Sequence, residues 1–141
     1  MPVPREEPCV CSQLRRTARL VSQFYDDALA SAGISVTQYA LLARIGRVDG
    51  LSRTALAAQL GMDRTTLTRN LAVLERAGLV ANKRGEDRRE KLLCLTAAGQ
   101  RQAAAARPLW LEAQQQMLNH LGRNRWRELR DLLLRSEQIL G

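Results

Sequence analysis

The sequence predicts a mainly α-helical protein with one small β-hairpin. Glycine and proline positions divide the 141 residues into short segments, and most of these segments repeat apolar side chains every three or four residues, which is the period of an amphipathic helix. The period changes to that of strands in two short stretches, 79–84 and 91–95, which a charged turn connects. No apolar run approaches the ~20 residues of a membrane helix, so we expect no membrane partner.

The helices expected around this hairpin are bounded by capping residues and glycines. The first covers 11–32, and the second begins near Thr37, a good N-cap, and runs to the Asp49-Gly50 turn. The others cover 53–60, capped by Ser52; the segment from Asp63 to the Ala77-Gly78 stop; 97–121, capped by Thr96, with Pro108 inside; and 125–140. Three prolines in residues 1–8 predict a disordered arm there.

Composition and charge narrow the class of protein. The chain has three Cys, an odd number, and its first residues lack the apolar segment of a secretion signal. We therefore expect reduced thiols and a cytoplasmic location rather than a disulfide scaffold. The net charge of +8 indicates an anionic partner, most often nucleic acid. Residues 53–91 carry nine basic and five acidic side chains, an excess of +4 that is larger than the +1 of residues 1–52 and the +3 of residues 92–141.

The segment 56–80 predicts the element that reads DNA. Its first helix has small and apolar residues for packing, and its second has leucines on one stripe and a polar face opposite. Arginine can pair with guanine edges in the major groove, and the threonine methyl group can contact thymine. The predicted DNA contacts around this helix are Ser52, Arg53, Arg64, Thr65, Thr66, Thr68 and Arg69.

The hairpin that follows carries cations where a purely structural turn would need only glycine and asparagine. A basic hairpin beside a recognition helix suits insertion of an arginine into the minor groove. The predicted contacts here are Lys83, Arg84, Asp87, Arg88 and Arg89. Residues 53–91 contain no Phe, Tyr or Trp for base stacking, so duplex DNA is favoured over RNA as the partner.

These motifs together resemble the MarR family of winged helix-turn-helix regulators. The resemblance rests on the run Leu74-Glu-Arg-Ala-Gly-Leu-Val80, on Asp87 and Arg89 in the hairpin, and on Leu95-Thr-Ala-Ala-Gly99. It implies that Arg89 enters the minor groove and that Asp87 braces it. It also implies one domain over 9–141, with a winged helix-turn-helix core at 37–97 and dimerisation helices at 11–32 and 97–140.

The expected function is therefore a transcriptional regulator, in this family usually a repressor, that binds a pseudo-palindromic operator as a homodimer. The C-terminal helices carry more apolar residues than a lone helix can bury, Leu109 and Trp110 among them, which favours a partner subunit. A small molecule or an oxidant would release such a regulator from DNA in response to stress.

Two kinds of signal remain open. The candidate redox sensor is Cys9 and Cys11 at the start of the first helix, where the helix dipole favours a thiolate, and Tyr25 resembles a tyrosine of the organic-hydroperoxide-sensing branch of the family. The alternative is a small aromatic acid, with Arg16, Arg19 or Arg44 available to its carboxylate.

An alternative of a different class is a thiol-based, peroxide-reactive enzyme that uses Cys9 and Cys11. The single His120 lies far from these cysteines in the sequence, and no catalytic base or phosphate loop is recognisable. We therefore expect no enzyme activity, no metal site and no cofactor.

Overall fold

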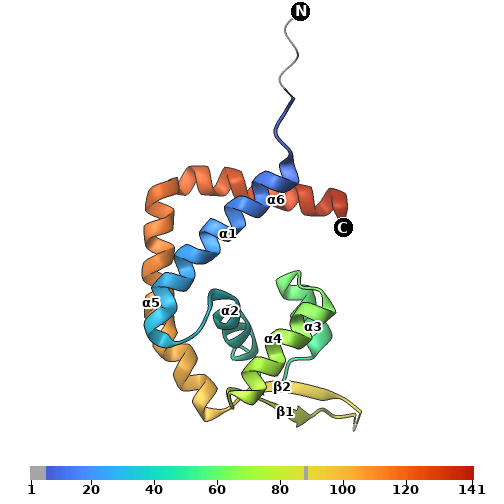
Figure 1. Ribbon diagram of the computed structural model, residues 1–141. Helices are drawn as coiled ribbons and strands as arrows, with labels where there is room; N and C mark the ends of the chain where they lie inside the picture. Colours follow the sequence, from blue (N-terminus) through green and yellow to red (C-terminus); the bar gives the residue numbers. More distant parts are fainter. Residues whose placement is uncertain (1–5, 88) are drawn as a thin grey trace, which may run out of the picture.

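The computed structural model describes residues 6–87 and 89–141, and within them the order of elements is that expected from the sequence (Figure 1). The elements are α1 (Val10–Leu29), η1 (Ala30–Ala32), α2 (Val36–Ile45), α3 (Arg53–Leu60), α4 (Arg64–Arg76), β1 (Val80–Arg84), β2 (Lys91–Leu95), α5 (Ala97–Leu121) and α6 (Arg123–Leu140). Mainly helical architecture with a two-stranded hairpin is thus confirmed.

The end of the first helix differs from the predicted one. The α-helix predicted to reach residue 32 ends at Leu29, because its last turn tightens into the 3₁₀-helix η1 before Gly33, whose φ is 73°. Of the predicted disordered arm, residues 1–5 lie outside the described part of the chain, and residues 6–8 are exposed and without regular structure.

The second helix begins before Thr37, because Ser35 is its N-cap. The Ser35 hydroxyl oxygen accepts the backbone N–H of Gln38 at 3.1 Å, and the Gln38 side-chain oxygen accepts the backbone N–H of Ser35 at 2.9 Å. This reciprocal capping box fixes the start of α2. Asp26 of α1 also accepts the backbone N–H of Val36 at 2.7 Å, which ties the two helices at this corner.

Helices α3 and α4 form the helix-turn-helix with the predicted boundaries. The hydroxyl oxygen of Ser52 caps α3, and the carboxylate of Asp63 caps α4. Between them Gly61 has φ 60° and ψ 32°, a left-handed conformation that glycine adopts without steric cost and that ends α3 within one residue.

The hairpin is a regular antiparallel pair in which Val80 lies opposite Leu95 and Arg84 lies opposite Lys91. A short third partner joins it: Leu51 and Leu93 exchange backbone hydrogen bonds of 3.0 and 2.8 Å. The middle of β2 is therefore fixed to the segment before α3, while the far end of the hairpin extends away from the helices (Figure 1).

The hydrophobic core lies between α2, α3, α4 and the base of the hairpin. Its fully buried side chains are mostly leucines, and the largest are Leu29, Leu41, Leu42, Ile45, Leu56, Leu71, Leu74 and Leu93. The stripe predicted for α4, which is Leu67, Leu71 and Leu74, is the buried face of that helix. Burial of this face leaves the opposite face of α4 exposed.

A glycine brings α5 onto this core. Gly99 lies one turn into α5, and a Cβ atom built there would stand 2.0 Å from the carbonyl oxygen of Leu79. Thr96 caps the helix and donates its hydroxyl to the carbonyl of Gly78 at 2.6 Å. The Leu-Thr-Ala-Ala-Gly sequence therefore returns the chain from β2 to a helix packed directly against the end of α4.

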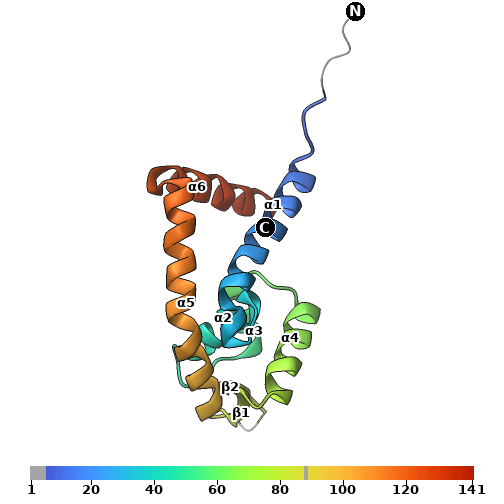
Figure 2. The same cartoon turned by 60° about the vertical axis from the view of Figure 1, so that its left-hand side comes forward.

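Helices α1, α5 and α6 form an open frame beside the core (Figure 2). Helix α5 continues through Pro108, and α6 begins at Arg123 rather than at the predicted residue 125. Leu109 and Trp110, which we expected to need a partner subunit, pack partly buried against the core of their own chain. Among the described residues no single helix is long and apolar enough to cross a membrane, and only α1–η1 and α2 together meet that criterion, as a pair bent by 71°.

Candidate DNA-binding surface

The exposed face of α4 carries most of the residues predicted to read DNA. Arg64, Thr65, Thr68 and Arg69 are exposed, whereas Thr66 is half-buried. They occupy the first turns of the helix, on the side away from Leu67 and Leu71. Two guanidinium groups and a row of small side chains thus cover the end of α4 that starts at Asp63.

Two of these threonines use their hydroxyl protons within the helix. Thr68 donates to the carbonyl oxygen of Arg64 at 2.8 Å, and Thr66 donates to the Asp63 carboxylate at 3.0 Å. What these side chains can offer to a base edge is therefore a methyl group and an acceptor oxygen rather than a donor.

Asp63 anchors the start of α4 as a carboxylate. The backbone N–H of Thr66 donates to it at 2.7 Å, and this bond, together with the Thr66 hydroxyl, holds the pKa of Asp63 below its usual value. Arg69 adds a smaller Coulombic contribution in the same direction. The first turn of the recognition helix is therefore best capped when Asp63 is ionised.

The hairpin carries exposed cations and lies, like α4, on the side of the molecule away from α5 (Figure 1). Arg84, Asp87 and Arg89 are exposed, and Arg88 lies outside the described residues. The backbone N–H of Arg89 donates to the Asp87 carboxylate at 3.2 Å. Asp87 therefore braces the turn through the backbone of Arg89, which leaves the Arg89 guanidinium at the exposed surface.

Lys83 is held differently from the arginines of the tip. Its ammonium group pairs with the Asp49 carboxylate at 2.7 Å, and its side chain is 36% exposed. Asp49 belongs to the loop between α2 and α3. Lys83 thus also links one face of β1 to the body of the fold.

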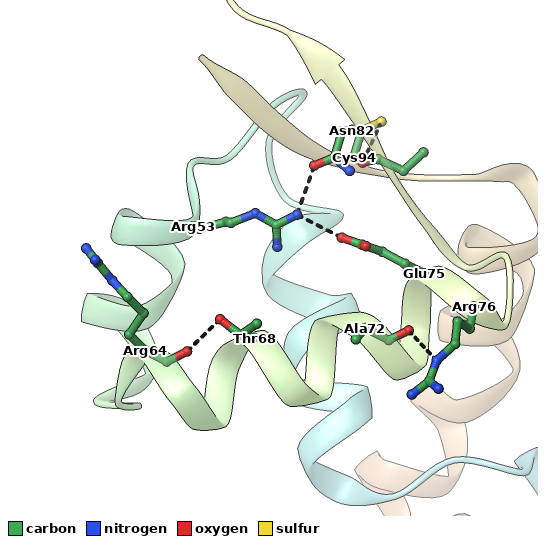
Figure 3. A network of polar contacts seen from close by, with 9 residues as sticks. Arg53, Arg64, Thr68, Ala72, Glu75, Arg76, Asn82 and Cys94 are labelled. Atoms are coloured by element: carbon green, nitrogen blue, oxygen red, sulfur yellow. Dashed lines mark hydrogen bonds and ion pairs between the residues drawn. The ribbon is translucent and has the colours of Figure 1, made fainter. Parts of the chain in front are cut away.

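Arg53 and Ser52 lie at the start of α3, beside the hairpin. Ser52 caps α3 by accepting the backbone N–H of Ala55 at 3.1 Å. Figure 3 shows Arg53 between α4 and the hairpin: its Nη2 donates to Glu75 Oε1 at 2.8 Å and to Asn82 Oδ1 at 3.1 Å. Sequence reasoning predicted Arg53 as a DNA contact and missed both of these partners.

A cavity of about 460 Å³ lies behind this surface, between α2, α5 and the end of β2. Arg44, one of the three predicted ligand-binding arginines, lines it, and Arg16 and Arg19 are exposed on α1 and are not among the lining residues. Tyr39 and Trp110 form one wall, with ring centroids 5.9 Å apart. Arg47 and Arg107 also line the cavity. Sequence reasoning missed them, although Arg47 follows Arg44 by only three residues, in the turn directly after α2.

The structure separates the three predicted redox residues into two environments. Cys9 and Cys11 are exposed at the start of α1, where the backbone N–H and hydroxyl of Ser12 lower the pKa of the Cys9 thiol. Tyr25 is buried further along α1 and donates its hydroxyl to the side-chain oxygen of Gln114 on α5. Burial raises the pKa of Tyr25. Within one chain, Tyr25 is thus a packing partner of α5.

The same Tyr25 lies at the inner end of an apolar groove of about 470 Å³ between α1, α5 and α6. The groove is lined by Leu14, Thr17, Ala18, Val21, Tyr25, Gln114, Met117, Leu118, Leu121, Trp126, Leu129 and Leu133. Within the described ranges, no three His, Cys, Asp or Glu side chains lie close enough together to hold a metal ion.

An exposed helix of arginines and threonines next to a basic hairpin defines a winged helix-turn-helix DNA-binding protein. A sequence profile described as the MarR family matches residues 32–90. The crystal structure of the Mycobacterium tuberculosis transcriptional regulator MosR in complex with DNA is similar at a TM-score of 0.79 and 39% identity, over 94% of this chain and 98% of that one.

Two further relatives agree with this match. The transcriptional repressor CouR of Rhodococcus jostii RHA1, bound to a 23-mer DNA duplex, superposes with a TM-score of 0.79 at 25% identity, over 92% of each chain. The transcriptional regulator YwoH of Bacillus subtilis (strain 168) is 30% identical over 84 residues, which are 60% of this chain and 61% of YwoH. The chain belongs to the MarR family of DNA-binding transcriptional regulators. The names of these relatives favour a regulator over the thiol enzyme weighed as the alternative.

Proposed function

We propose that this protein is a homodimeric repressor that binds a pseudo-palindromic duplex and leaves it in response to a small molecule or an oxidant. The observation that carries the proposal is the exposure of polar residues on both α4 and the hairpin, two elements that lie on the side of the molecule away from α5 (Figure 1). The DNA complexes of MosR and CouR, which have the same fold, support it.

In this proposal α4 enters the major groove and the hairpin tip enters the adjacent minor groove. Arg64 and Arg69 pair with base edges or phosphates. Thr66 and Thr68 offer methyl groups and acceptor oxygens, and Thr65 offers an exposed methyl group and hydroxyl. Arg89 reads the minor groove from a turn fixed by Asp87, and Arg84 and Arg88 add charge beside it. Lys83 and Ser52 contribute phosphate contacts.

Dimerisation follows from the apolar groove of the frame. In α6, all of which the structure describes, no side chain is buried, and Leu132, Ile139 and Leu140 are 60%, 82% and 85% exposed. Val10 and Leu20 of α1 are 71% and 64% exposed. A second copy of the chain would cover the exposed apolar side chains of both α1 and α6, because a two-fold axis places the same surface of each subunit against that of the other.

The duplex that the purified protein enriches from a randomised library tests this proposal. We expect an enriched sequence with two inverted half-sites about one helical turn apart. Arg89→Ala should weaken binding to it by about 5- to 150-fold, since one good groove contact is worth ~1–3 kcal/mol. The control is Arg125→Ala on α6, at the opposite end of the molecule from the hairpin (Figure 1). Equal affinities of both variants would contradict the assignment of the hairpin.

For the small-molecule signal, the cavity beside Tyr39 and Trp110 suits an aromatic anion. Its wall is aromatic, and Arg44, Arg47 and Arg107 place guanidinium groups around it, which suits a carboxylate. We expect 4-hydroxybenzoate to weaken binding to the enriched duplex more than the uncharged 4-hydroxybenzamide does, and Arg44→Ala to remove the difference. Identical effects of acid and amide would contradict this site.

For the oxidant signal, the start of α1 offers two exposed thiols. The thiolate attacks the O–O bond of a hydroperoxide, which forms a sulfenic acid and releases an alcohol. The lowered pKa of Cys9 increases its thiolate fraction at neutral pH. Cumene hydroperoxide should release the wild-type protein from DNA, whereas at least one of the variants Cys9→Ser and Cys11→Ser should stay bound. Equal release of the wild type and both variants would exclude a thiol sensor.

A further inference from the structure

One arginine joins the three elements that form the DNA-binding surface. Arg53 Nη2 at the start of α3 lies 2.8 Å from Glu75 Oε1 near the end of α4 and 3.1 Å from Asn82 Oδ1 in β1 (Figure 3). The Arg53 and Glu75 side chains are 39% and 33% exposed. The recognition helix α4 and the hairpin are joined covalently through residues 77–79, and Arg53 Nη2 connects them a second time through side chains.

The geometry between these two elements matters for DNA recognition. The major and minor grooves of a duplex lie at a fixed distance from one another, so a helix and a hairpin that enter adjacent grooves must keep a matching separation. Only residues 77–79 connect α4 to β1, and the backbone bridge between Leu51 and Leu93 holds β2 opposite Asn82 but joins it to the segment before α3, not to α4. Asn82 is on the exposed part of β1, two residues closer to the tip than Val80.

The electrostatics of Arg53 favour an internal role over a phosphate contact. Its guanidinium is already paired with a carboxylate, and Glu75 would repel a phosphate brought to the same place. If Arg53 bound a phosphate, Glu75 would act as a competitor for its charge. If Arg53 holds α4 and the hairpin together, Glu75 is a required partner.

We propose that Arg53 is a positioning residue for DNA recognition, which fixes the separation of α4 and the hairpin through Glu75 and Asn82. This inference rests on the DNA-binding function proposed above. Under this proposal Glu75, although it is acidic, favours DNA binding because it holds Arg53 in place.

The test measures the affinity of variants for the duplex enriched by the wild-type protein. Binding by the wild type establishes the function independently of Arg53, so a failure of the function and a failure of this inference are distinguishable. We expect Glu75→Ala to weaken binding by about fivefold, although it removes a negative charge. The matched control is Glu86→Ala in the hairpin turn, which removes the same charge without touching Arg53 and should bind as well as the wild type or better. Glu75→Ala that binds like Glu86→Ala would overturn the inference.

The salt dependence and the variant combinations separate positioning from phosphate binding. Arg53→Gln should have the same slope of log affinity against log salt as Glu75→Ala, because a phosphate contact made by Arg53 itself would be lost only in Arg53→Gln and would lower its slope by a further ~0.9. The double variant Arg53→Gln/Glu75→Ala should bind no more weakly than the weaker single variant. A lower slope for Arg53→Gln than for Glu75→Ala, or additive losses, would overturn the inference.

A third measurement reads the hairpin itself. Arg89→Ala should cause a smaller loss of DNA affinity in the Glu75→Ala background than in the wild type, because a hairpin that Arg53 no longer connects to α4 contributes less to binding. Asn82→Ala removes only the acceptor that the hairpin offers to Arg53, at an exposed position. It should weaken DNA binding by about twofold. This variant keeps the test valid if Glu75→Ala is unstable. Full Arg89→Ala penalties in both backgrounds would contradict the positioning role.

Discussion

The winged core and the helical frame are built from similar proportions of apolar residues, but they bury them very differently. In the core, Leu41, Leu56, Leu71 and Leu93 are completely inaccessible within a single chain. In α6 none of the residues, all of them described, is buried, and the groove between α1, α5 and α6 stays open. The core therefore completes its own packing, whereas the frame leaves apolar side chains exposed that the proposed dimer would cover.

From this difference we expect the core to determine the stability of the single chain and the frame to determine its association with a second chain. Substitutions in the core should act on the free energy of unfolding at any protein concentration. Substitutions in the frame should act on the association of two chains, so their effects should depend on concentration.

The largest effect is expected in the core. Leu71→Ala removes a fully buried side chain of α4 and should lower the free energy of unfolding by ~2–5 kcal/mol. Leu132→Ala on α6, at 60% exposure, removes the same atoms and should leave the unfolding of the dissociated chain almost unchanged. Urea unfolding at low protein concentration checks both variants. Similar losses for the two would erase the distinction between core and frame.

A somewhat smaller effect is expected where the two regions join. Gly99→Ala would place a Cβ atom 2.0 Å from the Leu79 carbonyl oxygen, and the required shift of α5 should cost ~1–3 kcal/mol. The neighbouring substitution Gln100→Ala, at an exposed position, should cost almost nothing. Thermal unfolding followed by circular dichroism compares them. A Gly99→Ala protein as stable as Gln100→Ala would show that α5 does not need this close approach.

The next effect isolates the frame. Leu129→Arg places a charge in the apolar groove of α1, α5 and α6 and should raise the dissociation constant of the dimer by at least about tenfold. The secondary structure of each chain should stay intact. Sedimentation at several concentrations measures the change, with Glu128→Ala, an exposed neighbour, as control. An unchanged dimer would place the interface elsewhere.

The smallest effect concerns pH and the start of α4. The pKa of Asp63 is lowered in the folded protein, so its ionised form adds stability above the ordinary Asp pKa, and this stability is lost as the pH falls through the folded pKa. Asp63→Asn keeps a good N-cap without the charge. The melting temperature of the wild type should exceed that of Asp63→Asn near pH 6, and the difference should shrink as the pH falls below the ordinary Asp pKa. A constant difference across this range would contradict the assignment.

The local part of the fold was predictable from sequence because it depends on neighbouring residues. The Ser52 and Asp63 caps, the Gly61 turn and the two strands are encoded by short-range chemistry, and they lie where the sequence predicts them, with β1 beginning one residue later. Thr37 was predicted as the cap of α2 and was wrong, because Ser35 pairs with Gln38 in a capping box. Both residue types make good caps, and only the geometry of the chain leaving η1 separates them.

The candidate site was predictable where exposure alone defines it and not where tertiary contacts do. The α4 face and Arg84, Asp87 and Arg89 are exposed as expected. The tie from Arg53 to Glu75 and Asn82 joins residues 22 and 29 positions apart, and the cavity brings Arg107 of α5 to Arg44 of α2. Such pairs depend on how helices pack, which periodicity does not specify.

The most direct test of the central claim is the stoichiometry of the complex with DNA. Native mass spectrometry of the wild-type protein with its enriched duplex should give two chains per duplex, and Leu129→Arg should shift the population toward free DNA. A complex of one chain on one duplex, with affinity unaffected by Leu129→Arg, would contradict the account of a dimer that places one recognition helix in each half-site.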